Sequence, residues 1–473
     1  MHMKTIKNKN SEALKSGFWY TICNFLVKSM GFISTPIFTR LLTKAEFGLY
    51  NNYVSWLTLI TVFVTINLEA SLISAKHDFE KNFNEYVFSL VLLTSMLGSI
   101  WLIFVNGFNA NLTRLTSMSP FYLNSMIIYI IFTAVINLYQ AKERYNYGYK
   151  KTVFVSTILA LVSTLLSIVL VILIEDKFFG RIVGTTIPSI ILGVILVACM
   201  RTKITSDFVS YWKYAIIICI PYIPHILAGS VLGSIDKIMI QQYWGSEANA
   251  LYSLAYNCAM IVTMLTISVN AAFGPWLSDK LKEKEFDTVK KVSRVYSASF
   301  MYAVIGIMLL APEILLVLGG SSYIEAKHVI PPVAMGCALQ FIYTMYVNVE
   351  QIKKKTIGMA IATVIAALIN WGLNLLFIPK LGYLAAAYTT LVGYLFLLLT
   401  HIYVVKKLHM AFVYDNVFSV ILTVIGIIIM SIMSVLYNFA LVRYVLLIIY
   451  IFIIAFIMFR YKSKIVAILK KGS

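Results

Sequence analysis

The sequence predicts an all-α polytopic membrane protein with about fourteen transmembrane helices. Of its 473 residues, 60% are hydrophobic and only 12% are charged, about half the charged share of a typical soluble domain. The apolar residues form blocks of roughly twenty, which is the length that a helix needs to cross a bilayer. Because these blocks are continuous and do not alternate with polar residues, they exclude a transmembrane β-barrel. The same composition excludes a cytosolic enzyme.

The predicted spans follow one another with only short connections. In chain order they cover residues 18–39, 49–75, 86–108, 120–139, 153–174, 182–200, 214–240, 250–274, 293–319, 328–350, 357–378, 382–405, 415–436 and 440–459. The longest connection, residues 275–292, carries charges of both signs and predicts an amphipathic cytoplasmic helix. No connection is long enough for a nucleotide-binding domain, and no Gly-x-x-x-x-Gly-Lys-Ser/Thr motif occurs, which argues against an ATP-driven pump.

Basic residues predict the orientation of these spans. The chain has 39 Lys and Arg against 20 acidic residues, a formal net charge of +19. If the N-terminus lies inside, the cytoplasmic segments hold 29 of the basic residues and the outer loops hold eight, while Lys28 and Lys237 fall within spans. The positive-inside rule therefore predicts that both termini are cytoplasmic. The same distribution accounts for the positive charge without nucleic acid as a partner.

A short internal echo predicts two related halves. Leu49-Tyr50-Asn51-Asn52-Tyr53 opens the second span and Leu251-Tyr252-Ser253-Leu254-Ala255-Tyr256 opens the eighth, so that Leu49 and Leu251 are 202 positions apart. Transporters are often built from such repeats, with the substrate site between them. The predicted organisation is an N-terminal lobe at residues 1–200, a C-terminal lobe at 201–405, and two additional helices with a basic cytoplasmic tail at 406–473.

Four groups of residues resemble one known family in the same order and spacing. They are Lys28 and Pro36 to Leu42 with Glu46 to Tyr50; Ser234 to Ile240; Leu251 to Tyr256 with Asn270 to Trp276; and Asn370, Asn374 and Ile378 to Gly382 with Ala385 to Ala387. Over nearly the whole chain, the sequence resembles the polysaccharide (Wzx-like) flippases of the multidrug/oligosaccharidyl-lipid/polysaccharide exporter superfamily.

The resemblance implies a fold of two six-helix lobes around a V-shaped central cavity, with two trailing helices. It also implies a flippase that moves undecaprenyl-pyrophosphate-linked oligosaccharide, such as an O-antigen or other surface polysaccharide repeat unit, across the bacterial inner membrane by alternating access. The partners implied are this lipid-linked substrate, membrane lipids, a polysaccharide polymerase and a chain-length regulator. A multidrug or cation antiporter of the same superfamily is the nearest alternative, followed by an integral-membrane polysaccharide polymerase.

Lys28 is the first of five candidate substrate-binding residues. It lies at the middle of the first span, where a lysine costs about 2.5–3.5 kcal/mol on insertion scales. We therefore expect its ammonium to face a cavity or a partner. One interpretation is a contact with the substrate pyrophosphate. The other is a structural ion pair with a carboxylate such as Glu69 or Asp236.

The other four candidates are charged residues within or at the end of spans. Asp236 and Lys237 are adjacent in the seventh span, so they point about 100° apart and cannot simply neutralise each other. Asp236 either lines the cavity or is buried by close packing of the Gly229 to Gly233 face. Glu69 either snorkels to the cytoplasmic interface or titrates in the cavity, and Arg40 either anchors the first span or contacts a head group.

Other polar residues have a structural interpretation. Pro221 and Pro224 predict a bend in the seventh span, and Asn370 and Asn374 share a helix face where they can join helices by hydrogen bonds. The five cysteines lack metal-binding spacing, and no catalytic motif occurs. The sequence therefore predicts neither an enzyme nor a cofactor. A proton, sodium, the membrane potential or a substrate gradient would each fit as the driving force.

Overall fold

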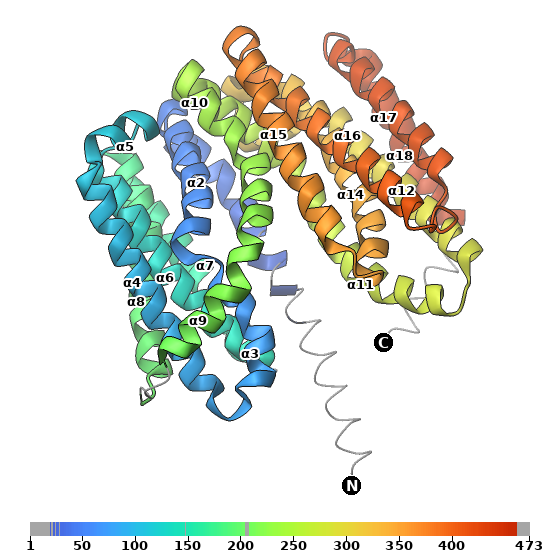
Figure 1. The fold of residues 1–473 in the computed structure, drawn as a ribbon. Coiled ribbons are helices and arrows are strands. Elements are labelled where there is room, and N and C mark those ends of the chain that lie inside the picture. Colours follow the sequence, from blue (N-terminus) through green and yellow to red (C-terminus); the bar gives the residue numbers. More distant parts are fainter. Residues whose placement is uncertain are drawn as a thin grey trace. The chain divides into compact units, whose positions relative to one another are not determined.

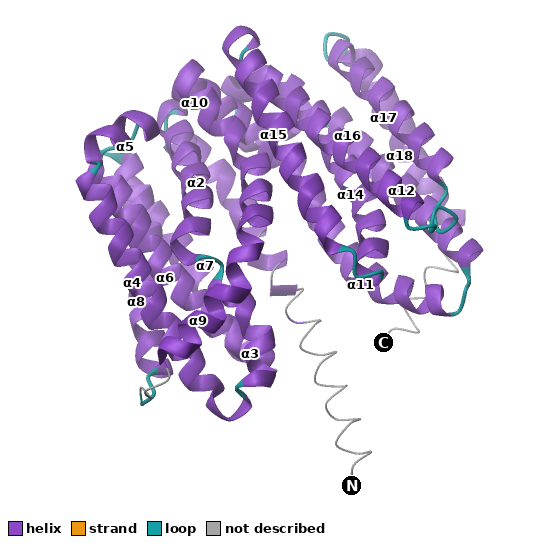
Figure 2. Ribbon diagram, in the orientation of Figure 1, coloured by secondary structure: helices purple, strands orange, loops and turns teal. Residues whose placement is uncertain are grey.

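The computed structural model describes residues 19, 22, 23, 25–27, 29–146, 148–203 and 208–460. Every regular element within these ranges is a helix (Figure 2). The predicted all-α fold class is therefore confirmed. Residues 29–41 form the helix that precedes α2, and Figure 1 labels the main helices that follow.

Six of the twelve helices from α2 to α10 have 22 or more residues, about the length that crosses a bilayer. They are α2 (Lys44–Thr65), η1 (Leu68–Ser71), α3 (Leu72–Asp78), η2 (Glu80–Asn82), α4 (Phe83–Gly107), α5 (Asn109–Thr116), α6 (Pro120–Tyr145), α7 (Tyr149–Leu173), α8 (Lys177–Met200), α9 (Phe208–Cys219), η3 (Ile220–Tyr222) and α10 (Ile223–Met260). Of the two prolines that predict a bend in the seventh span, Pro221 lies in η3, a single 3-10 turn between α9 and α10, and Pro224 is the second residue of α10. Proline removes a backbone donor there, so the α-helical ladder is interrupted.

The second half continues the same pattern. Its helices are α11 (Val262–Lys282), α12 (Phe286–Leu309), α13 (Ala311–Gly319), η4 (Ser321–Val329), α14 (Ile330–Ile352), α15 (Thr356–Leu381), α16 (Tyr383–Lys407), α17 (Asn416–Leu436) and α18 (Ala440–Arg460). Each of the fourteen predicted ranges overlaps helical residues in the described chain.

Ten helices in the described ranges are long and apolar enough to cross a membrane, or eleven if α2 and the bent segment after it count as one span. One of the ten, Phe208–Lys282, is interrupted at Gly245, whose φ of 80° and ψ of −175° are not helical. Ala440–Phe456 forms a shorter apolar helix. The predicted count of fourteen is therefore approximate.

Two details differ from the sequence prediction. The second span is not continuous, because Ile66 and Asn67 adopt left-handed conformations and the helix bends by 48°. The connection at residues 275–292 is not a separate amphipathic helix, because α11 continues to Lys282 and α12 begins at Phe286. In the short turn between them, the Lys280 ammonium lies 2.7 Å from the Glu283 carboxylate and 3.0 Å from that of Glu285.

The chain divides into two compact units, and neither is a single stretch of sequence. Unit 1 comprises Met1–Ser253 and Ile357–Thr389, and unit 2 comprises Leu254–Thr356 and Thr390–Ser473. The lobe boundaries predicted at residues 200 and 405 stay a prediction. All of the described substrate-binding candidates belong to unit 1.

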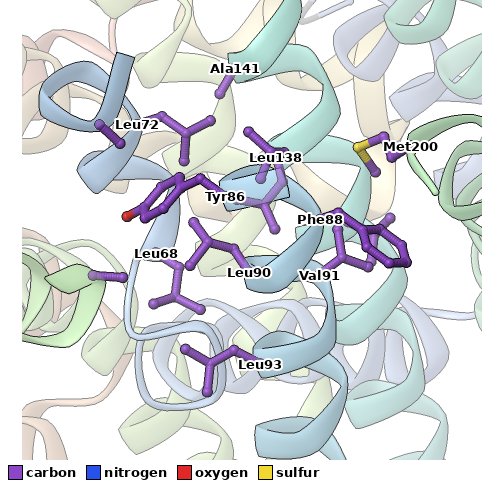
Figure 3. Close-up of a cluster of buried hydrophobic side chains, with 14 of the residues drawn as sticks. Leu68, Leu72, Tyr86, Phe88, Leu90, Val91, Leu93, Leu138, Ala141 and Met200 are labelled. Atoms are coloured by element: carbon purple, nitrogen blue, oxygen red, sulfur yellow. The ribbon is translucent and has the colours of Figure 1, made fainter. Parts of the chain in front are cut away.

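Unit 1 is built around helices α4, α6, α7 and α8, which pack on one another in pairs. A cluster of buried side chains lies along α4, including Tyr86, Leu90 and Leu93 (Figure 3). The Tyr86 hydroxyl donates to the Ser71 hydroxyl over 2.7 Å, which satisfies the polar end of this buried ring.

Glycines set the close approach of α7 and α8. A Cβ on Gly184 would lie 2.4 Å from the Ser167 Cα, and one on Gly180 would lie 2.9 Å from the Leu170 carbonyl carbon. These glycines have the G-x-x-x-G spacing that lets membrane helices pack closely. The predicted small-residue face at Gly229 and Gly233 shows no such close packing, because an added Cβ at either position meets no atom of the described residues within 4 Å.

Unit 2 is built around α14, which packs against α11, α12 and α17. Most of α14 is buried, and the rings of Phe300 on α12 and Phe341 on α14 stack with centroids 4.1 Å apart. A helix that is apolar on all sides is buried by its neighbours. Asn348 and Glu350 on α14 are consequently withdrawn from lipid and from water.

Candidate functional site

Four of the five candidate substrate-binding residues lie in the described part of the chain, and Lys28 lies outside it. Arg40 is exposed near the end of the helix at residues 29–41, where its guanidinium donates to the Pro36 carbonyl over 2.8 Å. This bond to the preceding turn caps a carbonyl and leaves the head of Arg40 at the surface. Its position suits both interpretations offered by the sequence, an anchor and a head-group contact.

Asp236 is buried on α10, with 2% of its surface exposed. The Tyr252 hydroxyl donates to its Oδ2 over 2.7 Å, and the Asn374 amide donates to its Oδ1 over 2.6 Å. Tyr252 comes from α10 beyond the break at Gly245, and Asn374 comes from α15. Among the described residues, two uncharged donors therefore hold the carboxylate between three helical segments.

The hydrogen bonds continue beyond the carboxylate. The Asn374 amide also donates to Asn370 Oδ1 over 3.3 Å, and the Thr389 hydroxyl donates to Asn374 Oδ1. Asn370, Asn374 and Thr389 are all buried. We call Asp236, Tyr252, Asn370, Asn374 and Thr389 the Asp236 cluster. Asn374 joins α15 to α10 through the buried carboxylate and to α16 through Thr389, whereas its bond to Asn370 lies within α15.

Lys237 follows Asp236 on α10 and is partly buried. The two side chains leave the helix in different directions, because consecutive residues are about 100° apart around the axis. Lys237 therefore does not belong to the same face of α10 as Asp236.

Glu69 lies in η1, directly after the break in the second span. It lines a cavity of about 90 Å³ together with Thr61, Thr65, Leu68, Asn67, Thr94, Thr133, Ala134, Asn137 and Leu138. The Thr94 side chain is 1% exposed, and its hydroxyl has no hydrogen-bond partner among the described residues. Glu69 thus lines a polar cavity between α2, α4 and α6, which we call the Glu69 cavity.

An apolar groove of about 350 Å³ lies between α10 and α15. Pro224, Leu227, Ala228, Val231, Ile235, Val364, Ala367, Leu368 and Trp371 line it. Ile235 precedes Asp236, and Trp371 follows Asn370, so the groove adjoins the Asp236 cluster on both helices. The Trp244 indole donates to the Ile378 carbonyl over 2.7 Å and joins the same two helices at their other end.

The two segments of the internal echo meet within unit 1. The Asn249 amide donates to the Gly48 carbonyl over 2.9 Å. A Cβ on Gly48 would lie 1.8 Å from the Ser246 carbonyl oxygen, so only glycine fits at this position. Both segments begin a helix here, α2 after the Thr43 cap and α10 after the break at Gly245.

The chemistry of these groups favours binding over catalysis. The Asp236 cluster offers carboxylate, amide and hydroxyl oxygens, which are ligands for a hard cation or acceptors for a proton. No group of three or more His, Cys, Asp or Glu side chains in the described ranges could hold a metal ion. The sequence pointed to Asp236, Asn370 and Asn374 separately. Tyr252 appeared there only as part of the Leu251 to Tyr256 segment and Thr389 did not appear, because their roles depend on the way the helices pack.

Family models match two overlapping parts of the chain. A model described as polysaccharide biosynthesis protein matches residues 13–281, more than half of the 473 residues. A model described as MatE matches residues 221–376.

Two curated relatives match most of the chain. An uncharacterized membrane protein of Methanocaldococcus jannaschii is 22% identical over 444 residues, which cover 84% of this chain and 84% of that protein. An uncharacterized membrane protein of Haemophilus influenzae is 22% identical over 374 residues, which cover 76% of this chain and 89% of that protein.

Solved structures share the fold at low sequence identity. The lipid II flippase MurJ in an inward closed conformation superimposes with a TM-score of 0.74 and 14% identity, covering 94% of this chain and 99% of that chain. An inward-facing multidrug resistance MATE family transporter of the MOP superfamily superimposes with a TM-score of 0.61 and 12% identity, covering 88% and 99%. The structural neighbours are thus transporters and flippases, which have the helical architecture that the sequence predicts.

Proposed function

Because the chain belongs to the polysaccharide biosynthesis protein family of the MOP exporter superfamily, we propose that it is a flippase for lipid-linked oligosaccharide. Its substrate would be an undecaprenyl-pyrophosphate-linked repeat unit of O-antigen or another surface polysaccharide. It would carry this molecule across the bacterial inner membrane by alternating access, with both termini in the cytoplasm. The chain is a multi-pass membrane transporter or flippase of this superfamily.

The observation that carries the proposal is the match of the polysaccharide biosynthesis model to residues 13–281. Two features of unit 1 support it. The substrate is an amphiphile with a polar head and a long isoprenoid tail. Unit 1 has both a polar compartment, the Glu69 cavity, and a groove between α10 and α15 with an almost wholly apolar lining.

We propose Lys28, Arg40, Glu69, Asp236 and Lys237 as residues that act on the substrate. The cations would attract the pyrophosphate, which binds most strongly to charged donors. Glu69 would accept hydrogen bonds from sugar hydroxyls in its cavity. The Asp236 carboxylate would act through the helices that it joins, because its two oxygens already accept hydrogen bonds from Tyr252 and Asn374.

Deletion of the gene in its own host tests the proposal. We expect lipid-linked oligosaccharide to accumulate on the inner leaflet and surface polysaccharide to disappear, with recovery on expression of the intact chain. Normal polysaccharide display in a host that has no second flippase would contradict the proposal. Polymerase and chain-length regulator are the proposed partners, and capture of the tagged protein from membranes tests them.

A multidrug or cation antiporter is the second candidate function. It is favoured by the match of the MatE model to residues 221–376 and by the likeness in fold to a multidrug resistance transporter. The deletion separates the two candidates, because an antiporter mutant would become sensitive to cationic drugs while its surface polysaccharide stayed intact.

A further inference from the structure

The Glu69 cavity holds a carboxylate that has no cation beside it in the described part of the chain. Its described lining residues include no Lys, Arg or His, and the Glu69 side chain takes part in no ion pair or hydrogen bond within the described ranges. A carboxylate among membrane helices is costly unless a partner compensates its charge. The lining of the cavity therefore shows what kind of partner fits.

Three threonines around the carboxylate present lone pairs to the cavity. The hydroxyls of Thr61, Thr65 and Thr133 each donate to the carbonyl oxygen four residues earlier in their own helix, over 2.6, 2.8 and 2.8 Å. A hydroxyl has one proton and two lone pairs. Because each proton is already donated within the helix, these oxygens can only accept a hydrogen bond or coordinate a cation.

Further oxygens come from two amides and from a third helix. The side chains of Asn67 and Asn137 each carry a carbonyl oxygen. Thr94 on α4 is 1% exposed, and its hydroxyl has no hydrogen-bond partner among the described residues. A buried polar group without a partner is unfavourable, and a cation in the cavity would give the Thr94 oxygen one. Asn137 is exposed and Glu69 is half-buried, so an ion has a route to the carboxylate.

The break in the second span lies at the same cavity. Helix α2 ends at Thr65, Ile66 and Asn67 adopt left-handed conformations, and Thr65, Asn67 and Leu68 line the cavity. The last carbonyls of a helix have no partner within the helix and form the negative end of its dipole. Interrupted helices provide cation sites in transporters for this reason. The end of α2 and the Glu69 carboxylate thus favour the same sign of charge.

Charge and size restrict the ligand further. One carboxylate lines the cavity, so a single positive charge neutralises it, whereas a divalent ion would leave an excess charge. Leu68 and Leu138 also line the cavity and belong to the buried apolar cluster around α4, so an excess charge there would be unfavourable (Figure 3). A volume of about 90 Å³ has room for a small ion and a few waters. Carboxylate, hydroxyl and amide oxygens are the ligands that hard cations prefer.

We propose that the Glu69 cavity binds a monovalent hard cation of the class of Na⁺, through the carboxylate of Glu69 and the hydroxyl oxygens of Thr61, Thr65, Thr94 and Thr133. These ligands lie on both sides of the break, so the bound ion holds the bend of the second span and joins it to α4 and α6. The site does not depend on the identity of the transported substrate. A carboxylate has about four lone-pair positions, so the ion leaves positions for the sugar hydroxyls proposed above.

Unfolding of the purified full-length protein by SDS tests the proposal, at constant pH and ionic strength with Na⁺ exchanged for N-methyl-D-glucamine. A ligand that binds only the folded state multiplies the folding constant by one plus the ratio of its concentration to its Kd. At Na⁺ concentrations above the Kd, the folding constant should therefore rise about tenfold for each tenfold rise in Na⁺. Radioactive sodium should bind to the folded protein and be displaced by unlabelled Na⁺.

Two pairs of variants locate the ion. Glu69→Gln keeps the shape of the side chain and removes its charge, so both the binding of sodium and the Na⁺ dependence of folding should disappear. Glu80→Gln is its control, because it removes the same charge from an exposed residue of η2 outside the cavity. Thr94→Val removes one ligand oxygen and should raise the Kd for Na⁺ on the order of tenfold. Thr152→Val is its control, because Thr152 on α7 is also buried, its hydroxyl also has no partner among the described residues, and it does not line the cavity.

Three results overturn the proposal. The first is a wild-type folding constant that does not respond to Na⁺, which is expected if a proton or the ammonium of Lys28 serves Glu69 instead. The second is a Na⁺ response that persists in Glu69→Gln and is lost in Asp236→Asn, which would place the ion at the Asp236 cluster. The third is an equal Na⁺ affinity of Thr94→Val and Thr152→Val, and this comparison decides the matter if Glu69→Gln does not fold. Normal polysaccharide display in the deletion strain would contradict the proposed function alone and leave the Na⁺ response unaffected.

Discussion

At the scale of the single residue, the buried carboxylate of Asp236 joins helices of unit 1 by hydrogen bonds. A carboxylate in the interior of a membrane protein is expensive unless donors surround it. Tyr252 and Asn374 supply those donors from two other helical segments. One ionisable group therefore links three helical segments. The energetic role of each donor can be measured separately.

Removal of either donor should destabilise the protein, and the two losses should differ in size. Tyr252→Phe deletes one hydrogen bond to a charged group, with an expected cost of about 1.5–3 kcal/mol. Asn374→Ala also removes the contacts with Asn370 and Thr389 and leaves a buried charge poorly compensated, with an expected cost of about 3–5 kcal/mol. SDS unfolding measures both. Equal stabilities of the two variants and the wild type would show that these hydrogen bonds do not stabilise the protein.

Lys28 allows a test that separates binding from stability. If its ammonium attracts the substrate pyrophosphate, Lys28→Ala should abolish polysaccharide display at normal membrane abundance, and Lys28→Arg should keep more activity than Lys28→Ala or Lys28→Gln. If its partner is a buried carboxylate, Lys28→Ala should lower abundance instead. Display and abundance measured together for the three variants distinguish these cases, and full display by Lys28→Ala would exclude both.

At the scale of the element, most helices could be predicted and most of their interruptions could not. A span of about twenty apolar residues is visible in any sequence, and Pro221 and Pro224 mark the interruption at η3. Asn67 is of a type that adopts the left-handed conformation more often than most, but Ile66 carries no such mark, because a β-branched residue rarely does.

The candidate site was predictable only in part for the same reason. Charges such as Asp236 and Glu69 stand out in an apolar sequence. Tyr252 and Thr389 do not, because tyrosines and threonines are common in membrane helices, and only the packing of α10, α15 and α16 brings these two to the cluster. The contact between the side chains of Glu350 and His401 likewise joins residues that are 51 positions apart.

The contact between α7 and α8 gives a prediction about helix packing. Gly184→Ala places a Cβ 2.4 Å from the backbone of Ser167, so the helices must separate, and we expect a loss of about 1–3 kcal/mol. Gly229→Ala is the control, because an added Cβ there meets nothing within 4 Å and alanine favours a helix by about 0.5–1 kcal/mol. SDS unfolding of both variants measures the difference, and a Gly184→Ala protein as stable as Gly229→Ala would contradict the packing argument.

At the scale of the whole molecule, topology is the quantity to measure. The asymmetry of 29 inner against eight outer basic residues predicts that both ends of the chain are cytoplasmic. Reporter domains fused at Ser11 and Ser473 should therefore both give a cytoplasmic signal. A periplasmic signal from either fusion would require an odd number of spans and a new assignment of the loops.

The contact between Gly48 and Asn249 also has a consequence for biosynthesis. Its two partners are 201 positions apart, so at 5–20 residues per second the ribosome needs about 10–40 s to deliver the second after the first. The synthesis of unit 1 takes longer still, because this unit includes Ile357–Thr389, and Asn374 in that segment donates to Asp236. Until Asn249 is synthesised, the Gly48 carbonyl at the start of α2 lacks its donor. Until Asn374 is synthesised, the Asp236 carboxylate lacks one of its two donors. We therefore expect the Asp236 carboxylate to be incompletely hydrogen-bonded in the nascent protein between synthesis of its seventh and eleventh spans.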